Sequence, residues 1–468
     1  MKRVRSMAAG LLTVILLLSA LILPGSASPG ENTVDLSTYE NFFSVKVGES
    51  ITLSHVNAPA GAKVTYAPYS EEFLKISGNK VTGVKPGLTI IDVNVDGSAS
   101  TTALIATYPT SGSCSTATTK SDLTWSVDTN NCLLTVKGKG AMPDYESVWD
   151  EHSDNPNASP WYFWVRACLV NRYDVVLEPG ITNISAFSFA TDSTRPGVRR
   201  AIIPASVTKI SGSAFYPAGY GNSDFYFCGD APEIGFAPFD PDSATLYYIE
   251  GKRGWTDSPA YDAATGTWNG YKLKTWSGNV EQEQLLSLPF KDVPRSALFY
   301  DAVDYVYKNG IMSGTGKDTF APGNKLTRAM VVQTLYNVEG KPAVNGKHGF
   351  PDVSADQWYN NAVTWAAQKG VVGGYGDGRF GPDDSVTLEQ VAVILWNYRG
   401  KPGTQNVDAN YYAEYISKHA PSDWAMDAMC WAQETRVLRD VAYTKPQEQA
   451  TRAQIAQMLT NYLTLGLN

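Results

Sequence analysis

The sequence is poor in charged residues, in cysteine and in histidine. Of its 468 residues, 18% are Asp, Glu, Lys or Arg, and there are five cysteines and four histidines. Five cysteines are too few for a scaffold built on disulfide bonds. The sequence also lacks the Cys-x-x-Cys, His-Glu-x-x-His and Gly-x-Ser-x-Gly motifs that are typical of metal sites and hydrolases. We therefore assign no catalytic residue, no metal and no cofactor.

Positive charge is scarce as well. The formal net charge is −8 at pH 7, which leaves no basic surface for a phosphate backbone and excludes nucleic acid as a general partner. The residues that are abundant are glycine (40), tyrosine (26) and tryptophan (12), in a chain that is 43% hydrophobic. This mixture favours strand-rich extracellular modules, and the length predicts about three domains.

A long apolar run occurs only near the N-terminus. Residues 1–5 are basic, residues 11–23 are apolar, and small residues follow at 24–28. This pattern predicts a secretory signal peptide over 1–28, cleaved after about Ala27. The alternative is an uncleaved membrane anchor, for which the apolar run is short. We expect an exported protein that has no membrane span after cleavage.

Residues 34–108 alternate between apolar and polar side chains in short runs. Turn signals separate the runs, for example at Gly48, Gly61 and Pro86. Such spacing predicts an antiparallel β sandwich. The segments VKVGESITL and SGNKVTGVKPGLTIIDVNV resemble the bacterial Ig-like domains of the second group. That resemblance implies a spacer or adhesive module.

Residues 114–276 begin with a predicted hairpin and continue with an internal repeat. Cys114 and Cys132 flank the hairpin, so a disulfide bond between them is one alternative. The repeat has an Ile-x4-Phe pattern, at Ile184 and Phe189, Ile210 and Phe215, and Ile234 and Phe239. A period of about 25 residues is typical of a solenoid, whose phenylalanines we expect in the core. The units resemble the leucine-rich repeats of bacterial surface antigens.

The C-terminal region contains the strongest repeat, after an expected linker over 277–289. Phe290 and Asp292 recur 60 residues later as Phe350 and Asp352. The same offset relates Ala302 to Ala362, Gly310 to Gly370, Phe320 to Phe380, Pro322 to Pro382 and Thr327 to Thr387. A third, degenerate copy contains Trp424, Trp431, Pro446 and Thr451. We expect three helix–loop–helix units, at 290–342, 350–402 and 408–468.

The start of the second helix in these units carries two local signals. Thr387 with Gln390, and Thr451 with Gln454, have the spacing of a capping box. An arginine follows the threonine in the first and third units, as Arg328 and Arg452. The first turn of a helix favours anions, and a guanidinium can bind a carboxylate with two hydrogen bonds. The alternative for these arginines is a solvated charge beside the cap.

The motifs Phe-x-Asp-Val, Trp-x3-Ala, Gly-Tyr-x-Asp-Gly-x-Phe and Thr-Arg-Ala, in tandem copies, resemble the S-layer homology (SLH) domain. The resemblance implies a three-fold helical module whose grooves hold a pyruvylated secondary cell-wall polysaccharide non-covalently. It also implies that Arg328 and Arg452 bind the carboxylate and that Trp358 and Trp424 contact a sugar ring. Phe299, one residue past that aromatic position in the first unit, is a further candidate. Core packing is the alternative for all three aromatic residues.

The units depart from the SLH pattern at several positions. The second unit has Leu388 where the family has arginine, so its groove is expected to bind weakly or not at all. The first unit has Leu298 in place of the tryptophan and Thr315 in place of the tyrosine. The third unit lacks the glycine-rich loop, and Arg436 stands where the second unit has Gly370.

The predicted fold class is therefore multidomain: an all-β Ig-like sandwich, a short leucine-rich-repeat-like β solenoid and an all-α three-fold SLH module. The predicted function is not enzymatic. We expect a secreted protein of the cell wall and cell surface (S-layer), anchored by its SLH repeats to the secondary cell-wall polysaccharide. Its N-terminal modules would be displayed for adhesion to host or matrix glycans or proteins.

Two alternatives place other activities in the middle region. One is a wall-bound glycan-active hydrolase, since paired carboxylates can cleave a glycosidic bond. Its candidate carboxylates are Asp144, Glu146, Asp150 and Glu151, near Trp149. The other is a carbohydrate-binding patch, for which packing at the end of the solenoid is the competing interpretation. Its candidate residues are Trp149, Trp161, Tyr162 and Trp164.

Overall fold

The computed structural model describes residues 32–36, 41–146, 157–167, 172–190, 197–216, 222–278, 288–295, 297–403, 409–443 and 445–464. The signal peptide predicted over 1–28 lies outside these residues. The chain forms two compact units, Met1–Leu286 and Ser287–Asn468, and each is described by itself. Within the described residues, no helix combines the length and the apolar character needed to cross a membrane.

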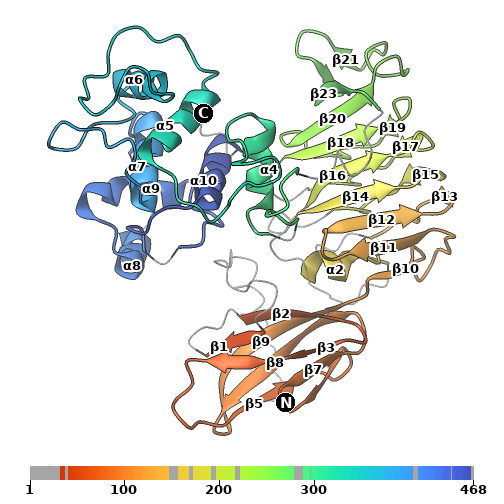
Figure 1. The fold of residues 1–468 in the computed structure, drawn as a ribbon. Helices are drawn as coiled ribbons and strands as arrows, with labels where there is room; N and C mark the ends of the chain where they lie inside the picture. The colour runs from red at the N-terminus through yellow and green to blue at the C-terminus, as the bar shows by residue number, and fades with distance from the viewer. Residues whose placement is uncertain are drawn as a thin grey trace. The chain divides into compact units, whose positions relative to one another are not determined.

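The first part of the N-terminal unit consists of small sheets (Figure 1). The larger sheet has the order β2-β9-β8-β5, and a second sheet has the order β3-β7-β6. Their strands are β2 (Asn41–Lys46), β3 (Ser50–Thr52), β5 (Val64–Pro68), β6 (Leu74–Ser77), β7 (Lys80–Gly83), β8 (Gly87–Val95) and β9 (Ser98–Tyr108), and β1 (Thr33–Asp35) pairs with β4 (Ser54–Val56). Buried and half-buried residues alternate along β2 and β8, because successive side chains of a strand point to opposite faces.

The second part of the N-terminal unit is a long sheet, in the order β10-β11-β12-β14-β16-β18-β20-β23-β22-β21 (Figure 1). Its strands from β12 to β23 run parallel. The bounds are β10 (Ser111–Ser113), β11 (Thr124–Asp128), β12 (Leu133–Lys137), β14 (Tyr173–Leu177), β16 (Val198–Ile203), β18 (Ser223–Phe227), β20 (Ala244–Ile249), β21 (Tyr261–Asp262), β22 (Thr267–Trp268) and β23 (Tyr271–Trp276). A narrower parallel sheet follows the same progression with β13 (Gly140–Ala141), β15 (Ile181–Ile184), β17 (Lys209–Ile210) and β19 (Glu233–Ile234).

A row of stacked aromatic rings forms the core between these two parallel sheets. Phe189 stacks on Phe215 at 4.9 Å between ring centroids, and Phe215 stacks on Phe239 at 5.5 Å. Trp161, at the start of helix α2 (Tyr162–Ala167), stacks on Phe189 at 5.3 Å. All four side chains are at most 1% exposed. The prediction that the repeated phenylalanines are core residues is confirmed.

Cys114 is buried in the same core and is not part of a disulfide bond. The bridge considered between Cys114 and Cys132 is therefore not formed. The phenol of Tyr145 donates a hydrogen bond to the Cys114 carbonyl at 3.0 Å. Burial raises the pKa of the Cys114 thiol to about 12, so the thiol stays protonated at neutral pH and is unreactive.

The C-terminal unit is helical, as Figure 1 shows, and its helices come in pairs that follow the sequence repeat. The first helices are α4 (Tyr300–Lys308), α6 (Asn360–Gln368) and α9 (Met426–Glu434). The second helices are α5 (Arg328–Val338), α7 (Leu388–Tyr398) and α10 (Arg452–Thr464). Helix α8 (Ala409–His419) and the short η1 (Asp423–Ala425) precede α9. The expectation of a β-rich N-terminal part and a helical C-terminal part is confirmed.

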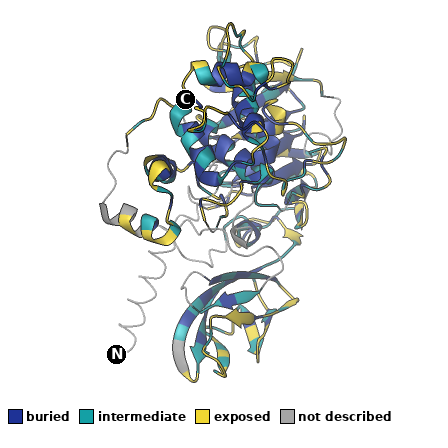
Figure 2. Cartoon of the chain, turned by 60° about the vertical axis from the view of Figure 1, so that its left-hand side comes forward, coloured by how far each residue is buried: buried dark blue, intermediate teal, exposed yellow. Residues whose placement is uncertain are grey.

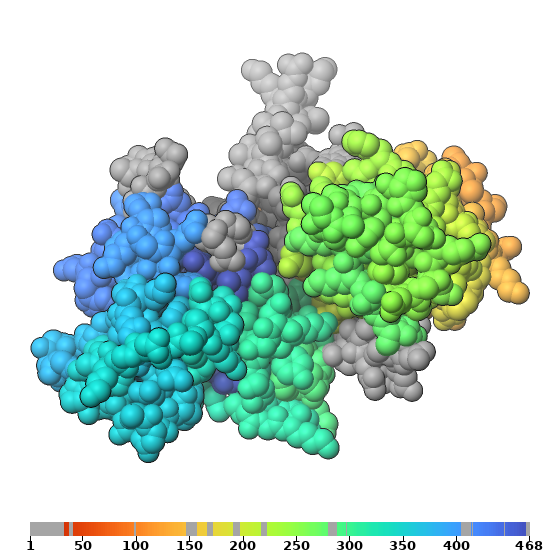
Figure 3. Space-filling view, turned by 90° about the horizontal axis from the view of Figure 1, so that it is seen from above, coloured from red at the N-terminus to blue at the C-terminus, as the bar shows by residue number. Residues whose placement is uncertain are grey.

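The three helix pairs close into a ring. The second helix of each unit packs against the first helix of the next: α5 against α6, α7 against α9, and α10 against α4. Isolated β bridges repeat this order, joining Thr327 to Ser385, Thr387 to Gln449, and Thr451 to Lys325. Figure 3 shows the three units side by side on one face of this part, from teal through cyan to blue.

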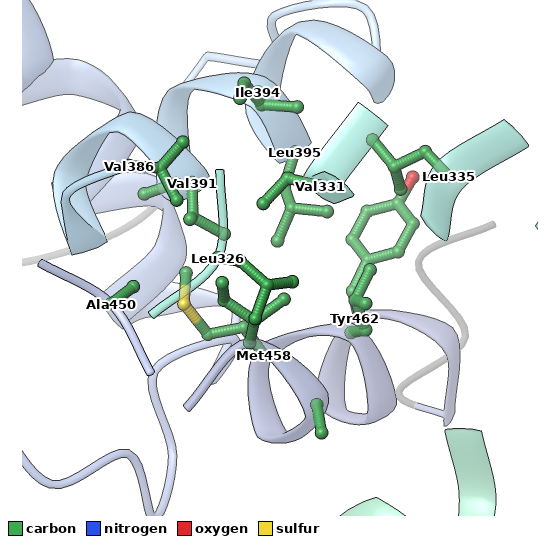
Figure 4. Packing of buried hydrophobic residues seen from close by; sticks show 14 of the residues in the cluster. Leu326, Val331, Leu335, Val386, Val391, Ile394, Leu395, Ala450, Met458 and Tyr462 are labelled. Atoms are coloured by element: carbon green, nitrogen blue, oxygen red, sulfur yellow. The ribbon is translucent and has the colours of Figure 1, made fainter. Parts of the chain in front are cut away.

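The centre of the ring is a shared apolar core. Leu326, Val386 and Ala450, each directly before a cap threonine, are at most 1% exposed and belong to one cluster. Figure 4 shows them grouped with Val391 and Met458 from the second helices. Figure 2 shows many buried residues in the helices and in the β sheets, whereas Ala413, Ser417 and Lys418 of α8 are exposed.

Both predicted capping boxes are present in the helical unit. The backbone N–H of Gln390 donates to Thr387 Oγ1, and the Thr387 N–H donates to Gln390 Oε1 at 3.0 Å. Thr451 and Gln454 make the same reciprocal pair. These local predictions are confirmed because they depend only on residues three apart in one helix turn.

Candidate functional site

The Phe-x-Asp-Val motif fixes the loop between the two helices of a unit. In the second unit, the Asp352 carboxylate accepts hydrogen bonds from the backbone N–H groups of Phe380 and Gly381, each at 2.8 Å. In the first unit, Asp292 accepts them from Phe320 and Ala321 at 2.9 and 2.7 Å. Each aspartate therefore fixes the C-terminal part of its loop. The chain then continues to Leu326 or Val386 in the central core.

Arg328, at the start of α5, reaches across to the loop of the second unit. Its Nε donates to the Phe380 carbonyl at 2.8 Å, and its Nη2 donates to the Gly373 carbonyl at 3.1 Å. The guanidinium carbon also lies 4.8 Å from the ring centre of Tyr375 and 5.0 Å from that of Phe380. Arg328 is only 8% exposed. We call this arrangement the 1–2 junction: Arg328 with the loop 373–385.

Arg452, at the start of α10, makes the equivalent contacts with the loop of the first unit. Its Nε donates to the Phe320 carbonyl at 2.7 Å, and its Nη2 donates to the Ser313 carbonyl at 2.6 Å. The guanidinium carbon lies 4.4 Å from the ring centre of Phe320. Arg452 is half-buried. We call this arrangement the 3–1 junction: Arg452 with the loop 313–325.

The position between the second and third units has no arginine. Leu388 stands there and is 1% exposed, within the apolar core. The next residue, Glu389, is 3% exposed and accepts hydrogen bonds from the backbone N–H and the hydroxyl of Ser422, at 3.1 and 2.9 Å. Gln447 adds a third bond to this carboxylate at 3.3 Å. The departure noted at Leu388 is therefore accompanied by a closed polar network.

The helix starts themselves are not open to an anion, which corrects one part of the sequence argument. The backbone N–H of Arg328 donates to the Asp384 carbonyl at 3.0 Å, and that of Ala329 donates to the Pro382 carbonyl at 3.1 Å. In α10, Arg452 and Ala453 donate in the same way to carbonyls of the first unit. These backbone donors are satisfied by the neighbouring unit, so an anion would have to bind the guanidinium alone.

The candidate aromatic residues fall into two groups. Trp358 and Trp424 are 58% and 59% exposed, before α6 and within η1 respectively. Such exposure of a large ring disfavours the core alternative for both tryptophans. Phe299 is half-buried against the central core, which favours the core alternative for this residue. The Trp358 ring contacts the neighbouring Tyr359 edge-on, with 5.1 Å between the ring centroids.

Charges around the two guanidinium groups differ. Burial lowers the pKa of Arg328, and Tyr375, Asp384 and Asp352 oppose that shift. Burial also lowers the pKa of Arg452, where Asp292 opposes it. Both arginines remain protonated at neutral pH, because an arginine pKa lies far above it.

In the middle region, the structure places some of the residues considered for catalysis or sugar binding. Trp161 and Trp164 are at most 1% exposed and pack in the core, which favours packing over a binding patch. Asp144 and Glu146 are exposed, while 147–156, with the remaining candidate carboxylates and Trp149, lie outside the described residues. One cavity there, of about 480 Å³, is lined by Tyr248, Thr256, Tyr261, Leu273, Lys274 and Thr275. Among the described residues, no cluster of His, Cys, Asp or Glu is suited to hold a metal ion.

The sequence did not predict that Asp292 and Asp352 accept hydrogen bonds from the loop backbone, or that two carbonyls hold each arginine. The repeated aspartate indicated only that the two positions are equivalent. Its partners lie 28 and 29 residues away along the chain, so the repeat alone did not identify them. The carbonyl partners of Arg452 lie 132 and 139 residues away, in another unit.

Comparison with known proteins identifies the family of the helical unit. The S-layer homology domain family matches residues 289–329 and 349–392, which lie in the first and second units. An endoglucanase of Bacillus sp. (strain KSM-635) is 26% identical over 196 residues, covering 40% of this chain and 20% of the endoglucanase. An S-layer protein of Bacillus thuringiensis subsp. finitimus is 31% identical over 107 residues, covering 23% of this chain and 13% of that protein.

Among solved structures, a leucine-rich repeat protein from Eubacterium ventriosum is similar to 34% of this chain and 43% of its own chain, at 20% identity. The TM-score of 0.20 is too low to support a fold assignment. The matched stretches span a fifth or less of the two curated relatives.

The C-terminal unit therefore contains S-layer homology domains. These similarities support a location at the cell wall and cell surface.

Proposed function

We propose that the C-terminal unit anchors this protein non-covalently to the cell wall by binding a pyruvylated secondary cell-wall polysaccharide. The observation that carries the proposal is the placement of Arg328 and Arg452. The repeat brings each guanidinium to a junction between consecutive units, where two backbone carbonyls hold it. A charged group fixed in advance loses less conformational entropy when it binds a ligand.

The remaining donors of these arginines suit a carboxylate. A guanidinium has five N–H groups, and the two protein bonds use the Nε–Nη2 edge. The Nη1–Nη2 end is therefore the edge that would bind the pyruvyl carboxylate with two hydrogen bonds. The exposed rings of Trp358 and Trp424 are proposed to pack against sugar rings, and the half-buried Phe299 to contribute less.

We further propose the domain layout that the repeats indicate. Residues 34–108 form an Ig-like domain and 114–276 a leucine-rich-repeat-like solenoid, which 277–289 link to three SLH units at 290–342, 350–402 and 408–468. The parallel strands from β12 to β23 and the regular aromatic stacking support the solenoid. These N-terminal modules would be displayed for adhesion to glycans or proteins of a host or matrix, and the protein would have no catalytic role.

A second candidate is a wall-bound hydrolase that acts on glycans through its middle region. The similarity to an endoglucanase favours this alternative. The lining of the described cavity contains neither a carboxylate nor a histidine, whereas glycoside hydrolysis needs a carboxylate pair. Incubation of the full chain with purified wall glycans, followed by an assay for new reducing ends, decides between the two. Release of reducing ends would replace the non-enzymatic proposal.

The anchoring proposal is tested by retention of the full chain on native cell-wall sacculi. We expect retention by native sacculi, loss after the pyruvyl groups are removed, and loss in the double variant Arg328→Ala/Arg452→Ala. Arg253→Ala is the matched control, because this exposed arginine pairs with Asp230 in the N-terminal unit. Retention should fall as salt rises, since salt screens charge pairs at a surface. Equal retention with and without pyruvyl groups would refute the proposal.

A further inference from the structure

We infer, on the basis of the proposed anchoring function, that the two arginine junctions have different roles. Arg452 at the 3–1 junction binds the carboxylate of the ligand. Arg328 at the 1–2 junction, the other candidate named above for the carboxylate, serves instead as a structural clamp that Tyr375 and Asp384 close. The residues that decide between the roles are Thr315 and Asn324 in one loop and Tyr375 and Asp384 in the other.

The two junctions share one framework, so they can be compared position by position. Each guanidinium donates from Nε to the carbonyl of a phenylalanine and from Nη2 to a carbonyl seven residues earlier in the loop. In both loops an aspartate of the Phe-x-Asp-Val motif binds the two backbone N–H groups at the loop end. Differences between the junctions therefore come from the side chains that the loops carry.

The first difference is an aromatic cover. Tyr375 lies 4.8 Å from the guanidinium carbon of Arg328, in addition to Phe380. The equivalent residue of the first unit is Thr315, which is exposed and has no ring, so in that loop Arg452 lies over the ring of Phe320. Accordingly, Arg328 is buried and Arg452 is half-buried. The Tyr375 ring offsets part of the positive charge of Arg328, so Arg328 attracts an anionic ligand less strongly.

The second difference is the crowding of two side chains over one glycine. A Cβ atom on Gly381 would lie 2.4 Å from Oδ2 of Asp384 and 2.6 Å from Cε2 of Tyr375. The equivalent position of the first unit is Ala321, which carries a Cβ in the same left-handed backbone region, at φ 58° against 70° for Gly381. Tyr375 and Asp384 therefore close together over the second loop, in space that the Cβ of Ala321 takes up in the first loop.

The third difference is charge. Asp384 stabilises the positive charge of Arg328, and the equivalent residue of the first unit is the neutral Asn324. The loop 373–385 contains three aspartates and one arginine, whereas the loop 313–325 contains two lysines and one aspartate. A carboxylate that approaches Arg328 meets negative charge, and one that approaches Arg452 meets positive charge. Both Asn324 and Asp384 are exposed, so this effect should weaken as salt rises.

The experiment measures binding of soluble pyruvylated wall polysaccharide to the full chain by titration calorimetry at low salt. The same polymer without its pyruvyl groups is the ligand control. We expect Arg452→Ala to lose at least tenfold in affinity, and Arg328→Ala to stay within about threefold while its melting temperature falls. Arg452→Ala should weaken binding because it removes the charged hydrogen-bond pair to the carboxylate. Arg328→Ala should lower the melting temperature because it removes the hydrogen bonds of a buried clamp.

Reciprocal exchanges avoid the risk that an arginine variant fails to fold. Asn324→Asp adds the negative charge to the 3–1 junction and should weaken binding about three- to tenfold. Asp384→Asn with Tyr375→Thr gives the 1–2 junction the side chains of the other loop, and should add a second binding site per chain. Asp356→Asn, an exposed change in the second unit, is the matched control and should leave affinity and stoichiometry unchanged.

The outcomes separate this inference from the proposed function. Absence of binding by the unaltered chain, or equal binding of the polymer without pyruvyl groups, would overturn both. Pyruvyl-dependent binding that Arg328→Ala and Arg452→Ala weaken equally would overturn the inference and leave the anchoring function intact. The same holds if Asn324→Asp has no effect while Arg452→Ala abolishes binding. A selective effect of Arg452→Ala and of Asn324→Asp supports the inference.

Discussion

In the N-terminal unit the repeats stack in a line, and in the C-terminal unit they close into a ring. Each parallel strand from β14 to β20 lies between its two neighbours, and the aromatic row passes from Trp161 through Phe189 and Phe215 to Phe239. A line has two ends, which must be covered by different residues. Here Trp161 packs against one end of the row and Tyr271 against the other, 5.4 Å from Phe239.

The ring has no end to cover, because the third unit packs against the first through α10 and α4. In a closed ring, every unit must pack against two neighbouring units and against the shared apolar centre. The degenerate third unit shows which features the ring needs. It keeps the cap threonine Thr451, the apolar Ala450 and the arginine Arg452, although it lacks the glycine-rich loop. Repeats stacked in a line therefore tolerate sequence changes at the two ends of the stack. Repeats closed into a ring tolerate sequence changes in their outer loops.

Removal of an aromatic side chain from the middle of the stacked row should have the largest effect on the free energy of unfolding. Phe215→Ala removes a side chain that is 1% exposed and contacts Phe189, Phe225 and Phe239. We expect a loss of about 3–5 kcal/mol in the free energy of unfolding, measured by chemical denaturation. Phe236→Ala is the control, because Phe236 is 90% exposed and should change it little. A loss below 1 kcal/mol would contradict the stacked core.

Truncation at the centre of the helical ring should be felt by all three units. Leu326→Ala is expected to cost about 2–5 kcal/mol. Because Leu326 shares one cluster with Val386 and Ala450, hydrogen exchange should become faster in α5, α7 and α10 alike. Met330→Ala, at a position of α5 that is 38% exposed, is the control. Faster exchange confined to α5 would show that the units fold independently and would break the comparison.

Loss of a loop-fixing carboxylate should have a smaller effect that depends on pH. Burial raises the pKa of Asp352, but hydrogen bonds from the Phe380 and Gly381 N–H groups, with help from Arg379, outweigh it and hold this pKa below its usual value. A lowered folded-state pKa stabilises the fold above the unfolded pKa of about 4, and this stabilisation is lost as pH falls through the folded value.

Asp352→Asn should therefore cost about 1–3 kcal/mol at pH 7, and the difference from the unaltered protein should shrink as pH falls below about 4. Denaturation at pH 7 and at low pH measures this. Asp356→Asn, exposed in the same unit, should be neutral at both values. A constant difference across the pH range would mean that the negative charge of Asp352 does not hold the loop.

Removal of one helix cap should have the smallest effect. Thr387→Ala deletes half of the capping box with Gln390 and is expected to cost about 1 kcal/mol. Ser354→Ala, at an exposed position of the same unit, should cost close to nothing. Thermal unfolding compares the two variants. Equal melting temperatures would show that the inter-unit bridge between Thr387 and Gln449, rather than the cap, sets the start of α7.

How far the sequence predicts the structure depends on how far apart the interacting residues are. The capping pairs and the helix starts at Thr387 and Thr451 follow from neighbours within one turn, and the sequence predicted them correctly. The burial of Phe189, Phe215 and Phe239 follows from an apolar residue repeated at a fixed period. For Trp358 and Trp424 the sequence left core packing and sugar contact open, because one aromatic residue before a helix fits either.

The sequence by itself determined that the chain contains repeats, that the C-terminal copies are SLH-like, and which residues the copies share. These properties depend only on which residue types recur at fixed offsets along the chain. Only the tertiary structure decided that Arg328 and Arg452 are held by carbonyls of another unit, and that the helix-start N–H groups are already satisfied. These contacts arise because the three units close into a ring, which brings together residues more than a hundred positions apart.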